Sequence, residues 1–492
     1  MKTRPYRYYD TAISLCATCL RRVDAKIVFE DGGVWMHKRC PQHGFQKVLL
    51  ADDIGFYRRA REVYLKVPEQ VLACNTPVHW GCPYDCGICP DHEQHGCTLI
   101  IEVTDNCNLR CPTCYAASGP ERVIHRSLTQ IEAMLDRAVL NEGEPAVIQL
   151  SGGEPTLHPE FFQIIEMMKT RPIQHLLLNT NGIRIASDPD FVEKLKQAYP
   201  DIEIYLQFDS FRREALQVLR GADMTRIRSQ ALQQLNRVNL STTLVSTIRR
   251  GINDDELGAT IDFALQQPCV RGVTFQPVQA AGRLDGYENG FDQKRDRLTL
   301  TEVRRLILEQ SDIFTPEDIV PVPCHADSVA MAYALKIDGK VLPLTGLVDD
   351  EFLLNSTRNT ISYENEPAVR DKLFDLFSTR HSPQSQATAV DQFLAAAGDV
   401  GRSLNFDYSN VFRVLIVQFM DAHSFDLRSI RKSCVHIVHP DGKRVIPFDT
   451  YNMFYRDELE QTVLGPIRQE RERYLYQQQL AVVENSSCKE IT

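Results

Sequence analysis

The segment TDNCNLRCPTCYA, residues 104–116, is the part of this sequence that decides the fold. It places Cys107, Cys111 and Cys114 in a Cys-x3-Cys-x2-Cys loop, directly after an apolar run at residues 99–103 that predicts a β-strand. Soft thiolates this close together suit either the irons of an iron–sulfur cluster or a zinc ion. An electron-transfer cluster would need a fourth thiolate, which the loop lacks. A cubane held by three cysteines keeps one iron open to a substrate.

A second motif follows the next predicted strand, residues 147–150. The sequence Ser-Gly-Gly-Glu-Pro starts at Ser151, and its glycines, Gly152 and Gly153, would let a ligand approach the backbone closely. Glu154 offers a carboxylate to a cationic amine. A Gly-Gly pair after a strand is often only a turn, but its position one helix and one strand after the cysteine loop makes the motif more specific.

Apolar, β-branched runs recur along the middle of the chain and predict six strands. They lie at residues 98–104, 146–150, 175–179, 203–208, 241–247 and 271–276. Helix-period segments separate them, and one of these begins at Ser127, whose side chain can form a capping box with Gln130. Strands that alternate with helices pair in parallel through right-handed crossovers, so the pattern predicts an open α/β sheet or a partial barrel.

The cysteine loop, the aromatic residue after it and the Gly-Gly-Glu segment together resemble the radical SAM superfamily. The resemblance implies a partial (βα)6 TIM-like barrel and a catalytic 4Fe–4S cluster whose open iron binds S-adenosylmethionine (SAM). It also implies reductive cleavage of SAM to a 5′-deoxyadenosyl radical that abstracts hydrogen from an unactivated C–H carbon. The residues implied in SAM binding are Tyr115 beside the purine, Gly152, Gly153 and Glu154 at the methionine amine, and Gln207, Asp209 and Ser246 at the ribose and carboxylate. Ordinary packing and strand-end solvation are the alternative roles of Tyr115 and of the last three residues.

The segment GCPYDCGICP, residues 81–90, repeats the same spacing with Cys82, Cys86 and Cys89. No Gly-Gly-Glu segment follows at the matching distance, so we predict an auxiliary 4Fe–4S cluster rather than a second SAM site, with zinc as the alternative. The candidates for its fourth ligand are Cys74, His92, His95, Cys97, Cys324 and Cys434.

Two short ligand pairs near the N-terminus predict a separate metal site. Two residues separate Cys16 from Cys19 and also Cys40 from His43, and the Asp-Gly-Gly turn at residues 31–33 favours a hairpin between the pairs. Two such pairs at this spacing are typical of a tetrahedral site for zinc or for a single rubredoxin-like iron.

Changes in composition divide the sequence into four parts. These are a Cys/His metal module at residues 1–65, an auxiliary-cluster connector at 66–97, the radical SAM core at 98–290, and an α+β C-terminal region at 291–492 that would cover the substrate side. The order of the metal motifs, together with the stretch CVHIVHPDG that starts at Cys434, resembles one branch of the superfamily. That branch contains the archaeal tetraether lipid synthases, which are also described as pterin-directed radical SAM methyltransferases.

The chain departs from that branch in its C-terminal region. Asp449 stands where the branch often has a cysteine, and the stretch from Val322 to Ser328 has one cysteine, Cys324. We therefore do not predict a third 4Fe–4S cluster, and we expect Cys324 and Cys434 to complete the auxiliary site. For the same reason, we do not directly assign the lipid-coupling activity of that branch to this chain.

Composition argues against several classes of protein. Of the 492 residues 24% are charged, the net charge is −10 and no basic stripe occurs, so we expect no nucleic-acid partner. No apolar run approaches the roughly 20 residues of a transmembrane helix, and the start MKTRPYRYYD lacks a signal-peptide core. We therefore expect a cytoplasmic protein whose 15 cysteines stay reduced, with peripheral membrane contact at most. The polar stretch at residues 378–389 predicts a linker.

Three functions remain open on the sequence alone. The first is a radical SAM enzyme that forms a carbon–carbon bond on an alkyl, lipid or small-molecule substrate. The second is a radical SAM methyltransferase that acts on a pterin-like ring. The third is a multi-cluster electron-transfer or metal-sensing protein, which would not need the Gly-Gly-Glu segment. A long apolar tunnel would favour lipid chains and a compact polar pocket a pterin, and either enzyme would need a low-potential electron donor such as flavodoxin or ferredoxin.

Overall fold

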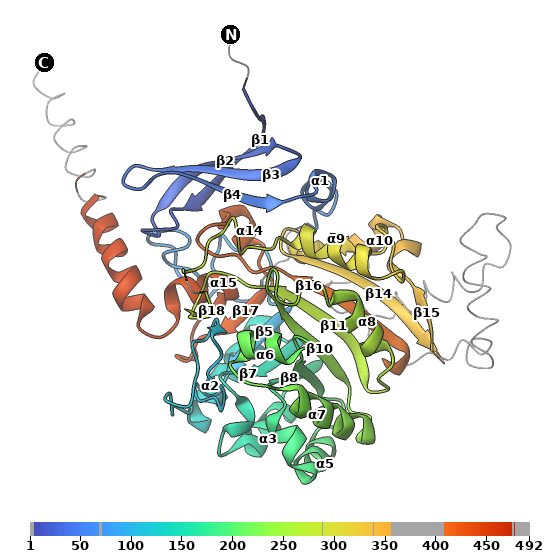
Figure 1. Ribbon diagram of the computed structural model, residues 1–492. Coiled ribbons are helices and arrows are strands. Elements are labelled where there is room, and N and C mark those ends of the chain that lie inside the picture. The colour runs from blue at the N-terminus through green and yellow to red at the C-terminus, as the bar shows by residue number, and fades with distance from the viewer. Residues whose placement is uncertain are drawn as a thin grey trace, which may run out of the picture.

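The computed structural model describes residues 4–67, 71–287, 289–337, 339–355, 408–474 and 477, so the predicted linker at 378–389 lies outside the described residues. The N-terminal part is an antiparallel sheet of four strands that follow the order of the chain: β1 (Arg7–Leu15), β2 (Arg22–Glu30), β3 (Gly33–Cys40) and β4 (Gly44–Ala51). The predicted hairpin turn joins β2 to β3, with Asp31 and Gly32 both at positive φ. Helix α1 (Ile54–Glu62), which Asp53 caps, follows this sheet (Figure 1).

The six predicted strands form the centre of a second, larger sheet. They are β5 (Thr98–Glu102), β7 (Val147–Ser151), β8 (His175–Thr180), β9 (Glu203–Gln207), β10 (Thr242–Ile248) and β11 (Val270–Pro277), all parallel and adjacent in that order. The helical elements between them are α2 (Leu128–Glu142), η1 (Pro155–Leu157), α3 (Phe161–Lys169), α4 (Ile183–Ser187), α5 (Pro189–Ala198), α6 (Arg213–Arg220), α7 (Thr225–Val238) and α8 (Leu257–Leu265). Helix α2 begins with the predicted capping box between Ser127 and Gln130. The strand and helix alternation predicted from the sequence is therefore confirmed.

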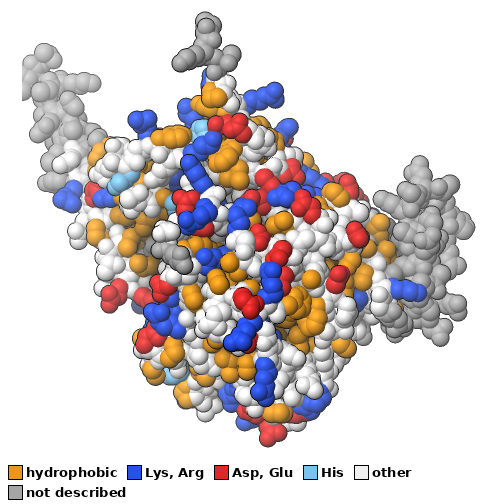
Figure 2. All heavy atoms as spheres, viewed as in Figure 1, with side chains coloured by type: hydrophobic (Ala, Val, Ile, Leu, Met, Phe, Trp, Pro, Cys, Tyr) orange, Lys and Arg blue, Asp and Glu red, His pale blue; other side chains and the backbone are white. Residues whose placement is uncertain are grey.

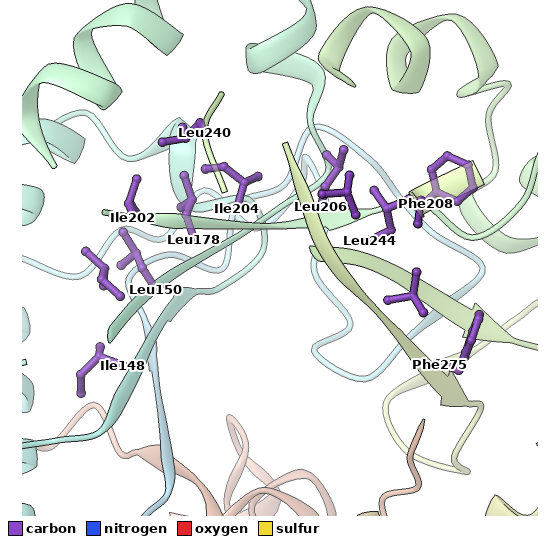
Figure 3. Close-up of a cluster of buried hydrophobic side chains, with 14 of the residues drawn as sticks. Ile148, Leu150, Leu178, Ile202, Ile204, Leu206, Phe208, Leu240, Leu244 and Phe275 are labelled. Atoms are coloured by element: carbon purple, nitrogen blue, oxygen red, sulfur yellow. The ribbon is translucent and has the colours of Figure 1, made fainter. Parts of the chain in front are cut away.

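Alternate side chains of the core strands face either the hydrophobic core or a cavity. Ile148 and Leu150 of β7 and Ile204 of β9 point toward the helices and join a continuous hydrophobic core (Figure 3). The intervening residues, such as Gln149 and Tyr205, face the opposite side of the sheet and line a cavity. Because strand side chains alternate between the two faces, one face of the sheet packs against helices and the other encloses a lumen.

The chain beyond β11 adds strands to the same sheet. Its elements are β12 (Arg283–Leu284), which pairs with β6 (Thr113–Cys114), α9 (Leu300–Gln310), β13 (Val320–Pro321), η2 (Pro323–His325), β14 (Val329–Ile337), β15 (Lys340–Pro343), η3 (Thr345–Leu347), α10 (Asp350–Asn355), η4 (Tyr408–Asn410), β16 (Val411–Val417), α14 (Leu427–Arg431), β17 (Val435–Val438), β18 (Val445–Pro447), α15 (Phe448–Thr450), η5 (Tyr451–Tyr455) and η6 (Glu460–Leu464). β16 pairs in parallel with β11, and β17 pairs in parallel with β5. Both edges of the six-stranded core are thus extended, and the sheet continues across residue 290.

Charges of both signs are interspersed on the molecular face shown in Figure 2. That face carries no continuous basic stripe over the side chains drawn there. Within the described ranges, every helix is too short or too polar to cross a lipid bilayer.

Candidate active site and metal centres

The predicted cluster loop leaves β5 and is held at its start by ion pairs. Asp105 accepts hydrogen bonds from Arg122 and Arg126 at 2.8 and 2.7 Å. Cys107 and Cys111 are each 8% exposed. Burial raises the pKa of the Cys107 thiol to about 12 and also raises that of Cys111. Both thiols therefore keep their protons unless a metal or cluster displaces them.

Hydrogen-bond donors point at the sulfurs of this loop. The backbone N–H of Leu109 lies 3.4 Å from the Cys107 sulfur, and the side-chain amide of Asn181 lies 3.9 Å from it. On the other side, the Arg220 guanidinium lies 3.9 Å from the Cys111 sulfur. Donors of this kind stabilise negative charge on sulfur and tune the reduction potential of a cluster. The surroundings of the loop therefore suit thiolates that carry a cluster.

The Gly-Gly-Glu segment packs directly on the backbone of the cluster loop. A Cβ atom on Gly152, whose φ is 141°, would lie 2.3 Å from the carbonyl oxygen of Thr104, and one on Gly153 would lie 2.3 Å from that of Asn106. The backbone N–H of Gly153 donates to the Thr104 carbonyl at 2.7 Å. The structure shows that the cluster loop makes a close approach to both glycines. Both also line the cluster hollow, so the approach of a ligand to them stays a prediction.

Glu154 is buried close to the cluster loop and does not line the cluster hollow. It is 1% exposed, and its carboxylate accepts hydrogen bonds from the Thr156 hydroxyl at 2.6 Å, the Thr180 hydroxyl at 2.9 Å and the backbone N–H of Asn181 at 2.8 Å. Burial raises the pKa of this carboxyl. Glu154 thereby fixes the turn from which Asn181 reaches the Cys107 sulfur.

Two hollows adjoin at the cluster loop. The first, of about 90 Å³, is lined by the three loop cysteines, Gly152, Gly153, Asn181 and Arg220, among others. The second, of about 200 Å³, is the lumen of the sheet. Cys114, Tyr115, Asn179, Gln207 and Arg220 border both. A reactive group formed in the first hollow would therefore be next to a molecule bound in the second.

The residues predicted at the ends of the fourth and fifth core strands have different placements. Gln207 borders both hollows, but Asp209 is 1% exposed and forms ion pairs with Arg220 and Arg228. Although burial opposes ionisation, these two cations lower the pKa of Asp209. Ser246 is also 1% exposed and borders neither hollow, whereas the next residue, Thr247, lines the lumen.

Sequence reasoning missed Arg220 and Asn181. Both reach the cluster loop from other elements, Arg220 from the last turn of α6 and Asn181 from the turn after β8. Neither residue belongs to a motif, so only the fold brings them to the cysteines.

The lumen has an amide-bearing wall and an apolar wall. The amide wall comes from the core strands and carries Gln149, Asn179, Gln207, Gln276 and Gln279, with apolar side chains such as Val147, Leu177 and Val245 between them. The apolar wall comes from the C-terminal region and carries Leu415, Val417, Phe419, Val435 and Phe448. The two walls together suit a molecule that has polar edges and apolar faces.

The N-terminal sheet brings all four predicted ligands together. The sulfurs of Cys19 and Cys40 are 3.8 Å apart, and Nδ1 of His43 lies 3.6 Å from the Cys16 sulfur and 3.5 Å from that of Cys40. Tetrahedral zinc at usual bond lengths requires about 3.8 Å between two sulfurs and about 3.6 Å between sulfur and nitrogen. Burial opposes ionisation of Cys16, but the backbone N–H groups of Cys19 and Thr18 lower its pKa to about 6. The four side chains fit a single metal ion.

The first Cys-x3-Cys-x2-Cys loop is enclosed by the C-terminal region. The Cys86 sulfur lies 3.1 Å from the Thr450 hydroxyl, and the Cys86 backbone N–H donates to the Tyr455 hydroxyl at 2.7 Å. Among the described residues, neither cysteine loop brings its three sulfurs within 4.8 Å of one another, although the N-terminal ligands lie this close. The two loops therefore surround more space than one ion needs.

A further group of cysteines comes from three distant parts of the chain. The sulfurs of Cys97, Cys324 and Cys434 all lie within 4.8 Å of one another and are buried. Nε2 of His95 lies 3.7 Å from the Cys97 sulfur, and its Nδ1 lies 3.0 Å from the Glu142 carboxylate. A carboxylate that orients a histidine in this way is common around metal ligands. The structure thus brings together three of the candidate ligands predicted for the auxiliary site, and the completion of that site by Cys324 and Cys434 stays a prediction.

Comparison with known families agrees with this geometry. Residues 101–264 match the radical SAM superfamily, and residues 8–52 match the HMPTM N-terminal zinc ribbon domain. The protein is therefore a radical SAM enzyme that carries an N-terminal zinc ribbon, as the resemblance of its motifs implied. The parallel α/β core is the fold expected of this superfamily.

A relative narrows the family further. The chain is 31% identical, over 93% of its length, to 96% of the 7,8-dihydro-6-hydroxymethylpterin dimethyltransferase of Methanocaldococcus jannaschii, and it belongs to the family of that enzyme. It is also 29% identical, over 46% of its length, to 67% of the GTP 3′,8-cyclase of Syntrophomonas wolfei. Among solved structures, Streptococcus suis SuiB bound to its precursor peptide SuiA aligns with a TM-score of 0.37 at 17% identity, over 44% of this chain and 46% of SuiB.

Proposed function

We propose that this protein is a radical SAM methyltransferase that acts on a pterin-like ring. The observation that carries the proposal is the lumen, which has a volume of about 200 Å³, adjoins the cluster loop and combines an amide wall with an apolar wall. A flat heterocycle has polar edges and apolar faces and matches such walls. The relationship to a pterin dimethyltransferase supports the same substrate class.

A buried charged group that lines the lumen argues against a lipid substrate. Glu203, at the start of β9, is fully buried and accepts hydrogen bonds from His175 at 2.8 Å and from Arg413 at 2.6 Å. A tunnel for an alkyl chain would need apolar groups here, because burying charged groups against hydrocarbon is costly. Carbon–carbon bond formation on a lipid is therefore the less supported alternative.

The same pairing argues against a nucleoside triphosphate. Two arginines border the lumen. Arg413 pairs with Glu203, and Arg220 pairs with Asp209 and turns its remaining nitrogen, Nη1, toward the cluster loop, where it would serve SAM. A triphosphate is normally held by cations that are free to pair with it. The lumen thus favours a neutral ring over GTP, the compound in the name of the cyclase relatives.

In the smaller hollow, Cys107, Cys111 and Cys114 would hold the 4Fe–4S cluster beside SAM. The bound cluster and SAM would together supply the 5′-deoxyadenosyl radical. Arg220 borders this hollow as a cation and would bind the SAM carboxylate. Glu154 and Asp209 would act as positioning residues, since Glu154 fixes Asn181 and Asp209 fixes Arg220. Tyr115, Gly152, Gly153 and Gln207 border the hollow and would contact SAM directly.

Three further metal centres follow from the side-chain groups. The ribbon ligands Cys16, Cys19, Cys40 and His43 would bind zinc, Cys82, Cys86 and Cys89 would hold an auxiliary 4Fe–4S cluster, and Cys97, Cys324 and Cys434 would hold an additional metal with His95 nearby. Total iron, sulfide and zinc per chain, measured after anaerobic reconstitution, tests this assignment. A Cys434→Ala variant should lose metal from the last group and keep its zinc.

One assay tests the proposed reaction. Anaerobically reconstituted protein is incubated with dithionite, SAM and 7,8-dihydro-6-hydroxymethylpterin, and products are followed by mass spectrometry. We expect 5′-deoxyadenosine from one molecule of SAM, and a pterin that has gained a methyl group from a second molecule of SAM, which leaves S-adenosylhomocysteine. Absence of 5′-deoxyadenosine from iron-loaded protein would contradict the radical chemistry and favour an electron-transfer or sensing role. Formation of 5′-deoxyadenosine without a methylated pterin would contradict the substrate. Replacing dithionite by reduced flavodoxin or ferredoxin tests the electron donor.

A further inference from the structure

Two amide side chains toward opposite ends of the amide wall of the lumen have no hydrogen-bond partner among the described residues. Gln149, in the middle of β7, faces the lumen and makes no side-chain hydrogen bond to any other described residue. Gln279 follows β11, and within the described residues both polar atoms of its amide are buried and unpaired. The strands β8, β9 and β10 separate β7 from β11, so the two residues lie toward opposite ends of this wall.

The other lumen amides are already engaged. Asn179 donates to Ser151 at 3.1 Å, Gln207 to Asp209 at 2.9 Å, and Gln276 to Tyr205 at 3.3 Å. Buried polar groups in native proteins are nearly always paired, and an unpaired one usually has a functional explanation. Gln279, whose amide is buried and unpaired, fits this description, and Gln149 offers a half-buried, unpaired amide at the surface of the lumen, so these two are the amides left for a bound molecule.

The segment that carries Gln279 is held firmly beside the cluster loop. The backbone N–H of Ala280 donates to the Asp421 carboxylate at 2.8 Å. A Cβ atom on Gly282 would lie 2.4 Å from the carbonyl oxygen of Cys114, so the backbones of the two segments are in contact. The terminal torsion of a glutamine is soft, so its amide plane can rotate toward a ligand while the backbone stays fixed.

We propose that Gln149 and Gln279 hold the substrate ring by its two polar edges and so determine which ring is accepted. A primary amide presents a donor and an acceptor side by side, which is complementary to a ring edge where a carbonyl and an N–H are adjacent. One of the two amides faces the lactam edge of the ring, and the other faces the opposite edge. The inference rests on the proposed function and adds to it the residues that select a neutral, amide-edged heterocycle.

Binding measurements on the reconstituted holoenzyme test this inference. The probe is 7,8-dihydro-6-hydroxymethylpterin, added anaerobically with SAM and without reductant, and its fluorescence gives the dissociation constant. Gln149→Met and Gln279→Met keep the side-chain size and remove the hydrogen bonds. Each should weaken binding about tenfold, the loss expected for one buried hydrogen-bonded edge. Gln233→Met, an exposed position on α7, is the matched control and should bind as the unmodified protein does.

A derivative methylated at the lactam nitrogen sharpens the test, because it cannot donate from that edge. The unmodified protein should bind it less tightly than the parent pterin, and one of the two variants should lose this preference. The inference is overturned if both variants bind the pterin as tightly as the control, or if both retain the full preference. If the unmodified protein cleaves SAM but binds GTP and not the pterin, the proposed substrate class and this inference both fail, while the radical chemistry stands. Iron content and thermal melting establish that each variant is folded.

Discussion

The two Cys-x3-Cys-x2-Cys loops have the same spacing and different surroundings. At residues 82–89 the Tyr455 hydroxyl donates to the Pro83 carbonyl at 3.0 Å and accepts from the backbone N–H of Cys86, so the C-terminal region closes over the loop. The loop at residues 107–114 instead borders a hollow that adjoins the lumen. Spacing gives both loops similar ligand geometry, so the surroundings decide which loop meets a substrate.

The largest expected difference between the loops concerns SAM cleavage. Cys111→Ala removes a ligand of the cluster that borders the hollow, and we expect 5′-deoxyadenosine to fall to the level seen without enzyme. Cys86→Ala alters the enclosed loop and should lower the iron content while SAM cleavage stays measurable. Quantified 5′-deoxyadenosine and metal analysis provide the comparison. The opposite pattern would exchange the roles assigned to the two loops.

A smaller difference is expected from glycines beside each loop. In Gly153→Ala the new Cβ would lie 2.3 Å from a backbone oxygen of the cluster loop, so the loop must shift. We expect SAM cleavage to fall about 100-fold, the effect of displacing a reacting group by about 1 Å. In Gly87→Ala the clash, at 2.1 Å, is with the Thr76 hydroxyl, a side chain that can rotate away, so the loss should be far smaller. Equal losses would show that the two glycines do not differ in role.

The donor at the Cys111 sulfur distinguishes the catalytic loop further. Arg220→Met should raise the KM for SAM about tenfold, because a charge-assisted hydrogen bond to the carboxylate is lost. Arg228 still pairs with Asp209 in this variant, which preserves the local fold. Arg213→Met, on the exposed side of the same helix, serves as the control. An unchanged KM would place the SAM carboxylate elsewhere.

The smallest effect on activity is expected at Asp449. This residue precedes Thr450, whose hydroxyl contacts the Cys86 sulfur of the enclosed loop. Burial raises the pKa of Asp449 from 3.8 to about 7. Between these values the unfolded chain releases its proton while the folded protein keeps it, so the stability of the protein falls as the pH rises from about 4 to about 7. Asp449→Asn should flatten this dependence, with a gain of up to about 4 kcal/mol at pH 7. Denaturant unfolding at several pH values measures it, and identical pH profiles would contradict the prediction.

Local pattern was enough to predict the core and its motifs. The six strands, the capping box at Ser127 and the N-terminal ligand pairs all depend on residues that are close in sequence. The pairing of β16 and β17 with the core depends on contacts between Arg413 and Gly272 and between Val435 and Thr98, for which no local pattern exists.

The parts of the site that sequence missed have similar causes. Arg220 reaches Cys111 because α6 folds back over the loop, and no motif marks that approach. At the end of β10, alternation allows either Ser246 or Thr247 to face the lumen, and the structure places Thr247 there. The group of Cys97, Cys324 and Cys434 joins three segments that lie far apart in sequence.

The late position of β16 and β17 in the chain also affects the order in which the parts of the sheet form. Both strands flank the core, yet they follow every core strand in the chain, and contacts over such long sequence separations form late. Until they dock, the edges of the nascent core are unpaired and the cysteine loops stay accessible from the side. A cluster can therefore reach the cysteine loops more easily before the C-terminal strands dock and close the lumen beside them.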